Sequence, residues 1–321
     1  MAYKIGDKVA TREAYGNALV ELADKYDYVV LDADLAAATK TGVFKKAHPE
    51  RFFDCGIAEG NMMCVAAGMA AAGQMAFAST FAMFAAGRAF EQVRNAIGYP
   101  HLNVKIGATH AGITVGEDGA THQCNEDIAL MRTIPGMTVV CPADATEAYA
   151  AVEAAINYYG PVYLRFGRFA VPDLTPELVP DYKFEFGRGV EYSRGKDVTI
   201  IATGFMVHLA VEAAEMLKAE GIDAGVINMH TVKPLDEALV IEAAKRSGAI
   251  VTAEEHNVIG GLGSAVADAV SANCPVPVLK VGVQDKFGKS GNVPDLLREY
   301  GLTAENIKEQ ALRAIALKQK I

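Results

Sequence analysis

The sequence predicts an α/β protein built from two doubly wound domains, each with a mostly parallel sheet. Short apolar runs alternate with longer helix-forming segments along nearly the whole chain, which is typical of strands buried between two layers of helices. This alternation is interrupted once, at residues 171–195. The length of 321 residues also suits two domains of ordinary size better than one.

The first domain is predicted at residues 1–170, where strands and helices follow one another in order. Helices are predicted at 14–25, 58–72, 83–97, 126–133 and 145–158. Strands are predicted at 28–32, 75–78, 103–108, 137–141 and 162–166. The strand segments are short and apolar, and the segments between them are long enough to cross a sheet, so parallel pairing is expected.

Residues 171–195 are predicted to be a linker, because prolines, glycines and charges gather there. The second domain is predicted at 196–321 and returns to the same alternation. Its strands are predicted at 197–202, 223–228, 249–253 and 278–281, and its helices at 207–220, 235–247, 263–271 and 306–318.

The composition excludes several classes of protein. Apolar residues make up 51% of the chain, which supports a large core and excludes disorder as its main state. The net charge of −9, with no basic run, argues against a nucleic-acid partner. The five cysteines form no CxxC pair, and the first residues are polar. We therefore expect no disulfide framework, no zinc site, no signal peptide and a cytoplasmic location.

Residues 60–87 carry no charged side chain and are long enough to span a membrane. They consist mostly of Ala, Gly and Met, lack Leu, and are interrupted by Gln74, Ser79 and Thr80. Such a composition inserts poorly into a bilayer. We interpret the segment as two buried helices around a short buried strand, and we expect no membrane partner.

A polar, glycine-rich loop after the strand at 103–108 is the strongest candidate site. It contains His110, Asp118 and His122 within the runs THAG and GEDGATHQ. Loops at the carboxyl ends of parallel strands form the ligand crevice, and imidazoles there can bind hydroxyl groups or move protons. Metal binding by the same three residues is a competing interpretation that we rank lower, because the spacing of ligands on one helix face is missing.

Glu59, Phe81 and Phe84 are the next candidates. Glu59 opens the uncharged segment, so it is either an ordinary helix N-terminal acid or a desolvated carboxyl group with a raised pKa that shares a proton with a ligand. Phe81 and Phe84 are spaced three apart after a predicted strand. They are either core residues of one helix face or a platform for a heteroaromatic ring.

Three arginines and two motifs complete the candidates. Arg12 stands at a predicted helix start, where a cation is disfavoured and an anionic ligand would favour it. Arg165 and Arg168 either bind anions or pair with surface acids. In the second domain, we interpret the glycines at 260–263 as a tight turn and Glu254-Glu255-His256 as a subunit contact.

Taken together, these motifs resemble the C-terminal half of transketolase over nearly the whole chain. The loop GEDGxTHQ at 116–123 is the most specific of them. Further resemblances lie at 9–12, around Glu59, and at 79–84. In the second domain they lie at 231–236, 254–263 and 287–291.

The resemblance implies roles for individual residues in binding thiamine diphosphate and a sugar. Glu59 matches the glutamate that hydrogen-bonds the aminopyrimidine ring and promotes its imino tautomer. Phe81 and Phe84 match the pocket for that ring, and Asp34-Leu35 matches a pair near the cofactor. His110, Asp118 and His122 match residues that contact the sugar, with both histidines in the catalytic group, and Arg12 matches an arginine that binds the sugar phosphate.

The resemblance also implies a partner. The family binds the diphosphate and a metal through a Gly-Asp-Gly motif followed by Asn-Asn, and this chain contains neither motif. We therefore expect an N-terminal subunit that carries these motifs and Mg²⁺ or Ca²⁺, an α2β2 assembly, and no activity of this chain alone. The expected reaction is the transfer of a two-carbon ketol unit from a ketose to an aldose. Ketose phosphates are among the expected donors.

Departures from the family pattern keep alternatives open. Gly87 stands where the family has a tyrosine, and Ala111-Gly112 stands where it has Asp-Ser. Arg165 and Arg168 bracket the place of a second phosphate arginine. A deoxyxylulose-phosphate synthase-like enzyme, a 2-oxo acid dehydrogenase β subunit and a non-catalytic scaffold therefore remain alternative interpretations.

Overall fold

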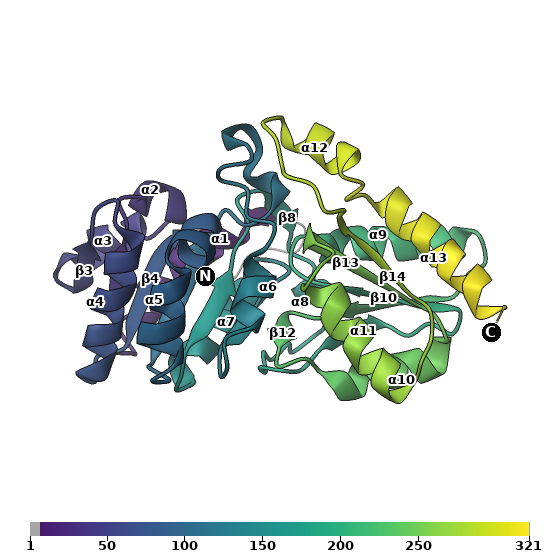
Figure 1. The fold of residues 1–321 in the computed structure, drawn as a ribbon, viewed down its shortest axis with the longest axis horizontal. Coiled ribbons are helices and arrows are strands. Elements are labelled where there is room, and N and C mark those ends of the chain that lie inside the picture. The colour runs from purple at the N-terminus through teal and green to yellow at the C-terminus, as the bar shows by residue number, and fades with distance from the viewer. Residues whose placement is uncertain (1–6, 321) are drawn as a thin grey trace.

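The computed structural model describes residues 7–320, which form two α/β lobes side by side (Figure 1). In the first lobe, the strand order of the larger sheet is β12-β6-β7-β5-β4-β2-β3. All neighbours in this sheet pair in parallel except β12 with β6. Its strands are β2 (Val29–Asp32), β3 (Phe52–Asp54), β4 (Ala76–Phe81), β5 (Val104–Thr109), β6 (Thr138–Val140), β7 (Val162–Arg165) and β12 (Thr231–Lys233).

Helices cover both faces of this sheet, as expected for apolar parallel strands. They are α1 (Thr11–Leu22), α2 (Ala36–Thr39), α3 (Gly42–Ala47), α4 (Glu59–Ala71), α5 (Phe90–Gln92), α6 (Asp127–Arg132) and α7 (Ala145–Asn157). Short 3₁₀ turns lie at η1 (Pro49–Arg51) and η4 (Ile113–Asp118).

The helix predicted at 83–97 is interrupted by two π-helical turns, η2 (Met83–Arg88) and η3 (Val93–Gly98). Each is closed by a bond from residue i+5, Ala89 N–H to the Phe84 carbonyl at 3.0 Å and Tyr99 N–H to the Arg94 carbonyl at 2.8 Å. Such wide turns often mark functional sites. Arg88 is the last residue of the first of them.

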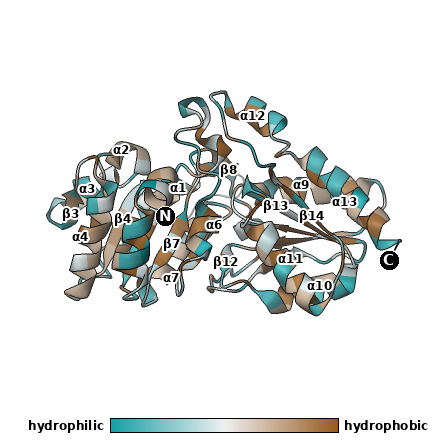
Figure 2. Ribbon diagram, viewed as in Figure 1, coloured by the Kyte–Doolittle hydropathy of each residue, from teal (hydrophilic) through white to brown (hydrophobic). Residues whose placement is uncertain are grey.

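The second sheet has the order β14-β13-β10-β11-β9, parallel except for β9 on β11. Its strands are β9 (Val190–Ser193), β10 (Val198–Ala202), β11 (Ala224–Asn228), β13 (Ile250–Asn257) and β14 (Val278–Val283). Its helices are α9 (Met206–Ala219), α10 (Glu237–Ser247), α11 (Leu262–Asn273), α12 (Val293–Glu299) and α13 (Ala304–Lys318). Figure 2 shows apolar strands in this sheet under helices with mixed surfaces.

The segment 171–195 is more ordered than a simple linker. It contains α8 (Thr175–Leu178), most of β8 (Ala170–Pro172) and all of β9. Strand β8 pairs with β1 (Lys8–Ala10), and β9 completes the edge of the second sheet. These pairings satisfy backbone groups that a free linker would leave to water.

The two domains share a core. One cluster of buried residues runs from Ala66 on α4 and Ile106 on β5 to Ile227 on β11 and Val266 on α11. The uncharged 60–87 segment forms most of α4, β4 and η2 inside the first lobe. Among residues 7–320, no helix is both long enough and apolar enough to cross a membrane.

Candidate functional site

The candidate residues gather at the carboxyl ends of β2, β4 and β5, which are neighbours in the first sheet. Asp34 and Leu35 follow β2, Phe81 ends β4, and His110 follows β5. Asp34 and His110 have positive φ values of 60° and 55°, so the chain turns sharply where each strand ends. This is the edge at which an open parallel sheet binds its ligands.

His110 lies at the centre of the group and is held on three sides. Arg12 Nη1 donates to its Nε2 at 3.0 Å, the Thr109 hydroxyl lies 2.9 Å from its Nδ1, and the Phe81 ring stacks on it at 3.8 Å. Because arginine can only donate, Nε2 must accept, and the proton of the neutral ring is on Nδ1. Burial and the Arg12 charge lower the pKa of His110 to about 3, so the ring stays neutral at physiological pH.

Arg12 is the second residue of α1 and is directed into this group. Its Nη1 also donates to the Ala38 carbonyl at 2.9 Å. Burial, and to a smaller degree the charge of Arg168, lowers its pKa, while Glu13 opposes this. Its Nε is buried and has no hydrogen-bond partner in the described part of the chain. The unpaired Arg12 Nε–H and the nearby charge of Arg168 would both favour an anionic ligand.

Phe81, Phe84 and His122 form an aromatic cluster beside His110. The Phe81 and Phe84 rings are stacked with centroids 5.8 Å apart, and the edge of His122 meets Phe84 at 5.4 Å. His122 is half-buried, with its Nδ1 2.9 Å from the Thr121 hydroxyl. Phe81 is buried like a core residue, whereas Phe84 is partly exposed and can carry a ligand.

Glu59 is the first residue of α4, and its side chain is only 1% exposed. Arg88 Nη1 donates to both of its carboxylate oxygens, at 2.8 and 2.9 Å. The Arg88 guanidinium also lies over the Phe84 ring, 4.3 Å from its centroid. Arg88 thus connects Glu59 to the aromatic cluster, with 52% of its own side chain exposed.

Arg88 was absent from the candidates drawn from the sequence. The available signal was its position as the first charged residue after the uncharged stretch 60–87. A cation that ends such a stretch is well placed to pair with the Glu59 that precedes it. Sequence spacing could not show the pairing, because the two residues lie on different helices.

A cavity of about 660 Å³ opens beside the aromatic cluster. Phe84, Arg88 and Thr121 line it from the first domain, and Asn257, Phe287 and Gly288 line it from the second. Phe287 is 90% exposed there. The cavity therefore lies between the domains, at the mouth of the group around Phe84.

Asp34, Leu35 and Asp118 make contacts separate from those of the group around His110. Asp34 is exposed, and its N–H lies 3.2 Å from an Asp54 carboxylate oxygen; the Leu35 N–H donates to Asp32 at 2.6 Å. Asp118 is exposed and faces Arg168 at 3.9 Å. Within residues 7–320, no hydrogen bond or ion pair joins these three residues to His110 or Glu59. Within the described residues, no cluster of three or more His, Cys, Asp or Glu is arranged to hold a metal ion.

The two remaining arginines differ sharply. Arg165 is buried and donates to the buried Asp127 at 2.8 Å. The expectation that Arg165 pairs with a surface acid was therefore wrong, because its side chain is directed into the domain boundary, where it also donates to the Glu255 carbonyl. Arg168 instead faces Glu117 and Asp118 on the polar loop and is partly exposed.

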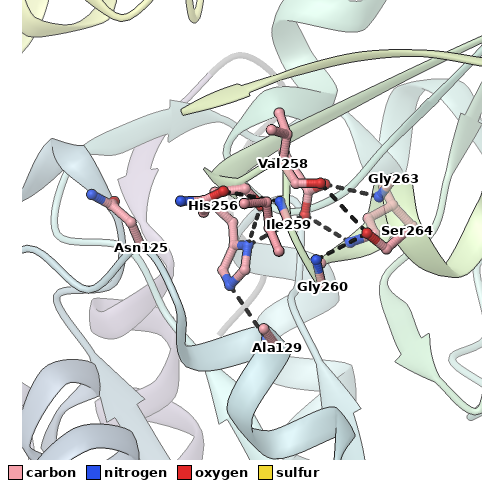
Figure 3. Close-up of polar contacts among 12 residues, drawn as sticks. Asn125, Ala129, His256, Val258, Ile259, Gly260, Gly263 and Ser264 are labelled. Carbon is pink, nitrogen blue, oxygen red and sulfur yellow. Dashed lines mark hydrogen bonds and ion pairs between the residues drawn. The ribbon is translucent and has the colours of Figure 1, made fainter. Parts of the chain in front are cut away.

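The expected subunit contact at Glu254-Glu255-His256 was also wrong. All three side chains are buried within this chain. Glu254 accepts from the N–H groups of Leu262 and Gly263, at 2.7 and 2.8 Å, and so occupies the N-terminus of α11. The glycine turn at 260–263 therefore holds a carboxylate of the chain itself. Figure 3 shows His256 above Ala129 of α6, beside this turn.

Comparison with known proteins covers both lobes. The family described as "Transketolase, pyrimidine binding domain" matches residues 7–173, and "Transketolase, C-terminal domain" matches residues 187–307. A transketolase C-terminal section from Methanocaldococcus jannaschii is 48% identical over 303 residues, which cover 94% of this chain and 95% of that protein.

Two further similar proteins are named as a transketolase subunit and as a split gene transketolase. The 6-deoxy-6-sulfo-D-fructose transketolase subunit SqwH of Clostridium sp. (strain MSTE9) is 45% identical over 94% of this chain and 92% of its own length. A solved structure described as a split gene transketolase in an inactive beta4 tetramer superposes with a TM-score of 0.89. It is 56% identical and covers 97% of this chain and 99% of its own. These matches lend no support to the synthase or dehydrogenase alternatives.

Proposed function

Because the chain belongs to the transketolase family, we propose that it is the C-terminal subunit of a two-subunit thiamine diphosphate-dependent transketolase. The complete enzyme would move a two-carbon ketol unit from a ketose to an aldose. The observation that carries the proposal is the buried Glu59 carboxylate beside the partly exposed Phe84 ring. Arg88 joins the two, because its guanidinium donates to Glu59 and lies over the Phe84 ring.

The groups around Glu59 fit an aminopyrimidine. A guanidinium is a planar cation with N–H donors, and it lies here against an aromatic face and a carboxylate. A protonated aminopyrimidine is also planar and also presents N–H donors. Phe81, Phe84 and Glu59 would hold this ring, with Asp34 and Leu35 nearby. When bound, thiamine diphosphate supplies a carbon nucleophile for cleaving the bond next to a ketose carbonyl.

The residues of this chain would act by holding protons and hydroxyl groups in place. Glu59 would hold the proton of the pyrimidine ring nitrogen. His110, neutral because its pKa is lowered to about 3, would serve as a hydrogen-bonding group for the sugar and not as an acid. His122 would be the second imidazole at the sugar, and Asp118 would bind a sugar hydroxyl.

Arg12 and Arg168 favour a sugar with an anionic tail. Arg12 has an unused buried donor, and Arg168 is the partly exposed member of the arginine pair at 165 and 168. One relative is named for a sulfonated ketose, whose tail is anionic. We therefore propose a phosphate or sulfonate at the end of the donor sugar remote from the reacting carbonyl.

A partner subunit completes the proposal. The chain contains no Gly-Asp-Gly and no Asn-Asn, so the diphosphate and its Mg²⁺ or Ca²⁺ would be held by an N-terminal subunit. The names of two similar proteins, a transketolase C-terminal section and a transketolase subunit, support this division. Two copies of each subunit would form the enzyme, and this chain alone would be inactive.

The decisive experiment reconstitutes the chain with its partner, thiamine diphosphate and Mg²⁺, and measures ketol transfer from phosphorylated, sulfonated and uncharged ketoses. Glu59→Gln should lower kcat by about 10²-fold or more, the usual contribution of a proton-transferring group, without disrupting assembly. Full activity of the assembled Glu59→Gln enzyme would contradict the assignment. Equal use of charged and uncharged donors would contradict the anionic tail.

A further inference from the structure

Two segments of the second domain hold the polar loop of the first domain, residues 110–123. The Gln123 side-chain amide donates to the carbonyls of Ile113, Gly116 and Lys289, at 3.2, 3.3 and 3.0 Å. Gly119 packs so closely on Ser290 that a Cβ there would lie 2.4 Å from the Ser290 hydroxyl. The loop therefore rests on the segment around Ser290 of the second domain.

The second segment is the end of β13, which reaches the loop through Glu255. Its Oε1 accepts the N–H of Thr114 at 2.6 Å, and the residue is only 2% exposed. A Cβ on Gly112 would lie 2.4 Å from the same oxygen, so the carboxylate fills the space that only glycine leaves. Gly112 also has a φ of 76°, which suits glycine.

Glu255 is itself fixed from the first domain. Arg165 Nη2 donates to the Glu255 carbonyl at 2.8 Å and to the Cys124 carbonyl at 3.4 Å. Cys124 in turn accepts the Gly112 N–H at 2.9 Å, which closes the base of the loop. One buried arginine thus ties the backbone of Glu255 to the base of the loop that its carboxylate contacts.

Glu254 and His256, the residues on either side of Glu255, make contacts with other parts of the chain. Glu254 accepts from the start of α11. His256 Nε2 accepts the Ala129 N–H of α6 at 3.3 Å, and its Nδ1 lies 2.7 Å from the Asn257 carbonyl (Figure 3). Of the three adjacent residues, only Glu255 contacts the loop that carries His110 and His122.

We propose that Glu255 is a positioning residue that fixes the His110–His122 loop, so that the C-terminal domain sets the geometry of the sugar side of the site. The link is short: Thr114 lies four residues after His110, and Gln123 follows His122 directly. The catalytic consequence rests on the proposed function, whereas the structural consequence does not.

The structural consequence can be tested on this chain alone by hydrogen–deuterium exchange. Glu255→Ala should speed exchange in peptides covering 110–123 by about tenfold or more, the factor expected when a buried N–H loses its acceptor. Glu255→Gln keeps an acceptor of the same reach and should protect the loop. Glu255→Asp keeps the charge but shortens the reach, so it should behave like Glu255→Ala and serves if the alanine variant does not fold.

Glu254→Ala is the matched control, because it removes an adjacent buried carboxylate that contacts α11 instead. It should speed exchange at 262–273 and leave 110–123 unchanged. Loop protection that survives Glu255→Ala and Glu255→Asp would overturn the proposal. So would faster exchange spread evenly over the whole chain, or Glu255→Gln behaving like Glu255→Ala.

The catalytic consequence needs the reconstituted enzyme. Glu255→Asp should raise KM for the donor by about tenfold, while the affinity for thiamine diphosphate should change less than about twofold. The Glu255→Gln enzyme should have the same KM as the wild type. Equal losses of donor and cofactor affinity would overturn the positioning role. If the wild-type complex shows no ketol transfer, the proposed function fails, and the exchange result still decides whether Glu255 holds the loop.

Discussion

At the scale of single residues, the Glu59–Arg88 ion pair raises a conflict that cofactor binding must resolve. The carboxylate is almost fully buried, while the guanidinium is half exposed and lies on the ring that would carry the pyrimidine. If the pyrimidine takes the carboxylate, Arg88 has to give up at least one of its two contacts there. The ion pair thus stabilises the free chain and opposes the cofactor.

Arg88→Gln should therefore tighten thiamine diphosphate binding by the reconstituted enzyme several-fold, on the order of 1 kcal/mol for a partly exposed pair. It should also lower the Tm of the free chain, because Glu59 stays buried without its partner. Isothermal calorimetry and thermal melting measure the two effects. Arg94→Gln, an exposed arginine on the next π-helical turn, is the control. Weaker cofactor binding would mean that Arg88 contacts the cofactor directly.

At the scale of elements, β5 carries a lysine where a central strand normally has an apolar side chain. Lys105 is fully buried, and its ammonium donates to the carbonyls of Tyr158 and Gly160, both at 2.7 Å. It thereby fixes the turn between α7 and β7 to the centre of the sheet. Burial lowers its pKa to about 7.

This buried lysine predicts how stability depends on alkaline pH. Between about pH 7 and pH 10, the unfolded chain binds the lysine proton more than the folded chain does, so the free energy of unfolding should rise with pH in this window. Lys105→Met should flatten that rise, and Lys196→Met, at an exposed position, should not. Urea unfolding at pH 7 and pH 9.5 gives the comparison. An unchanged slope in Lys105→Met would show that other groups cause the rise.

The elements also show what the sequence could and could not predict. The central strands β4, β5, β7, β10 and β13 were predictable because an apolar run between glycine- or proline-rich turns has few alternatives. The short strands β3, β9 and β12 were not, since three or four residues at a sheet edge owe their conformation to a partner strand. Strand β12 also directly precedes Pro234, which argues locally against a strand.

The same distinction applies to the candidate site. The sequence pointed to His110, Phe81 and Phe84 because they follow strands, and the structure brings them together with Arg12 and His122. Arg88, Glu255 and the burial of Arg165 depend on contacts between segments far apart in the chain. Such contacts follow from the packing of domains, which local pattern does not encode.

At the scale of the whole molecule, a buried polar network joins both domains to the segment between them. Glu147 of α7 accepts from Tyr182 at 2.6 Å and from Asn228 of β11 at 2.9 Å. Asp144, the N-cap of the same helix, accepts from the backbone N–H groups of Glu147 at 3.0 Å and Thr175 at 2.7 Å. Burial and the neighbouring Glu147 charge raise the pKa of Asp144 to about 7.

Asp144 therefore predicts a loss of stability as the pH rises through the acidic range. The folded chain binds its proton up to about pH 7, whereas the unfolded chain releases it near pH 4, so the free energy of unfolding should fall between these values by a few kcal/mol. Asp144→Asn keeps an N-cap acceptor and should remove much of this fall. Urea unfolding at pH 5 and pH 7.5 tests it. Identical slopes in the two proteins would exclude Asp144 as the cause.

A strand that crosses from the second domain to the first sheet limits how this protein can be divided. Strand β12 leaves the second domain to pair with β6 of the first sheet, and its last residue, Lys233, donates to the carbonyls of Arg132 and Ile134. A cut between the lobes would remove β12, one of the two neighbours of β6, and leave an open sheet edge that invites aggregation. The two domains are therefore poor interchangeable modules. Chimaeras between relatives should be joined outside this pair, with both lobes inherited together.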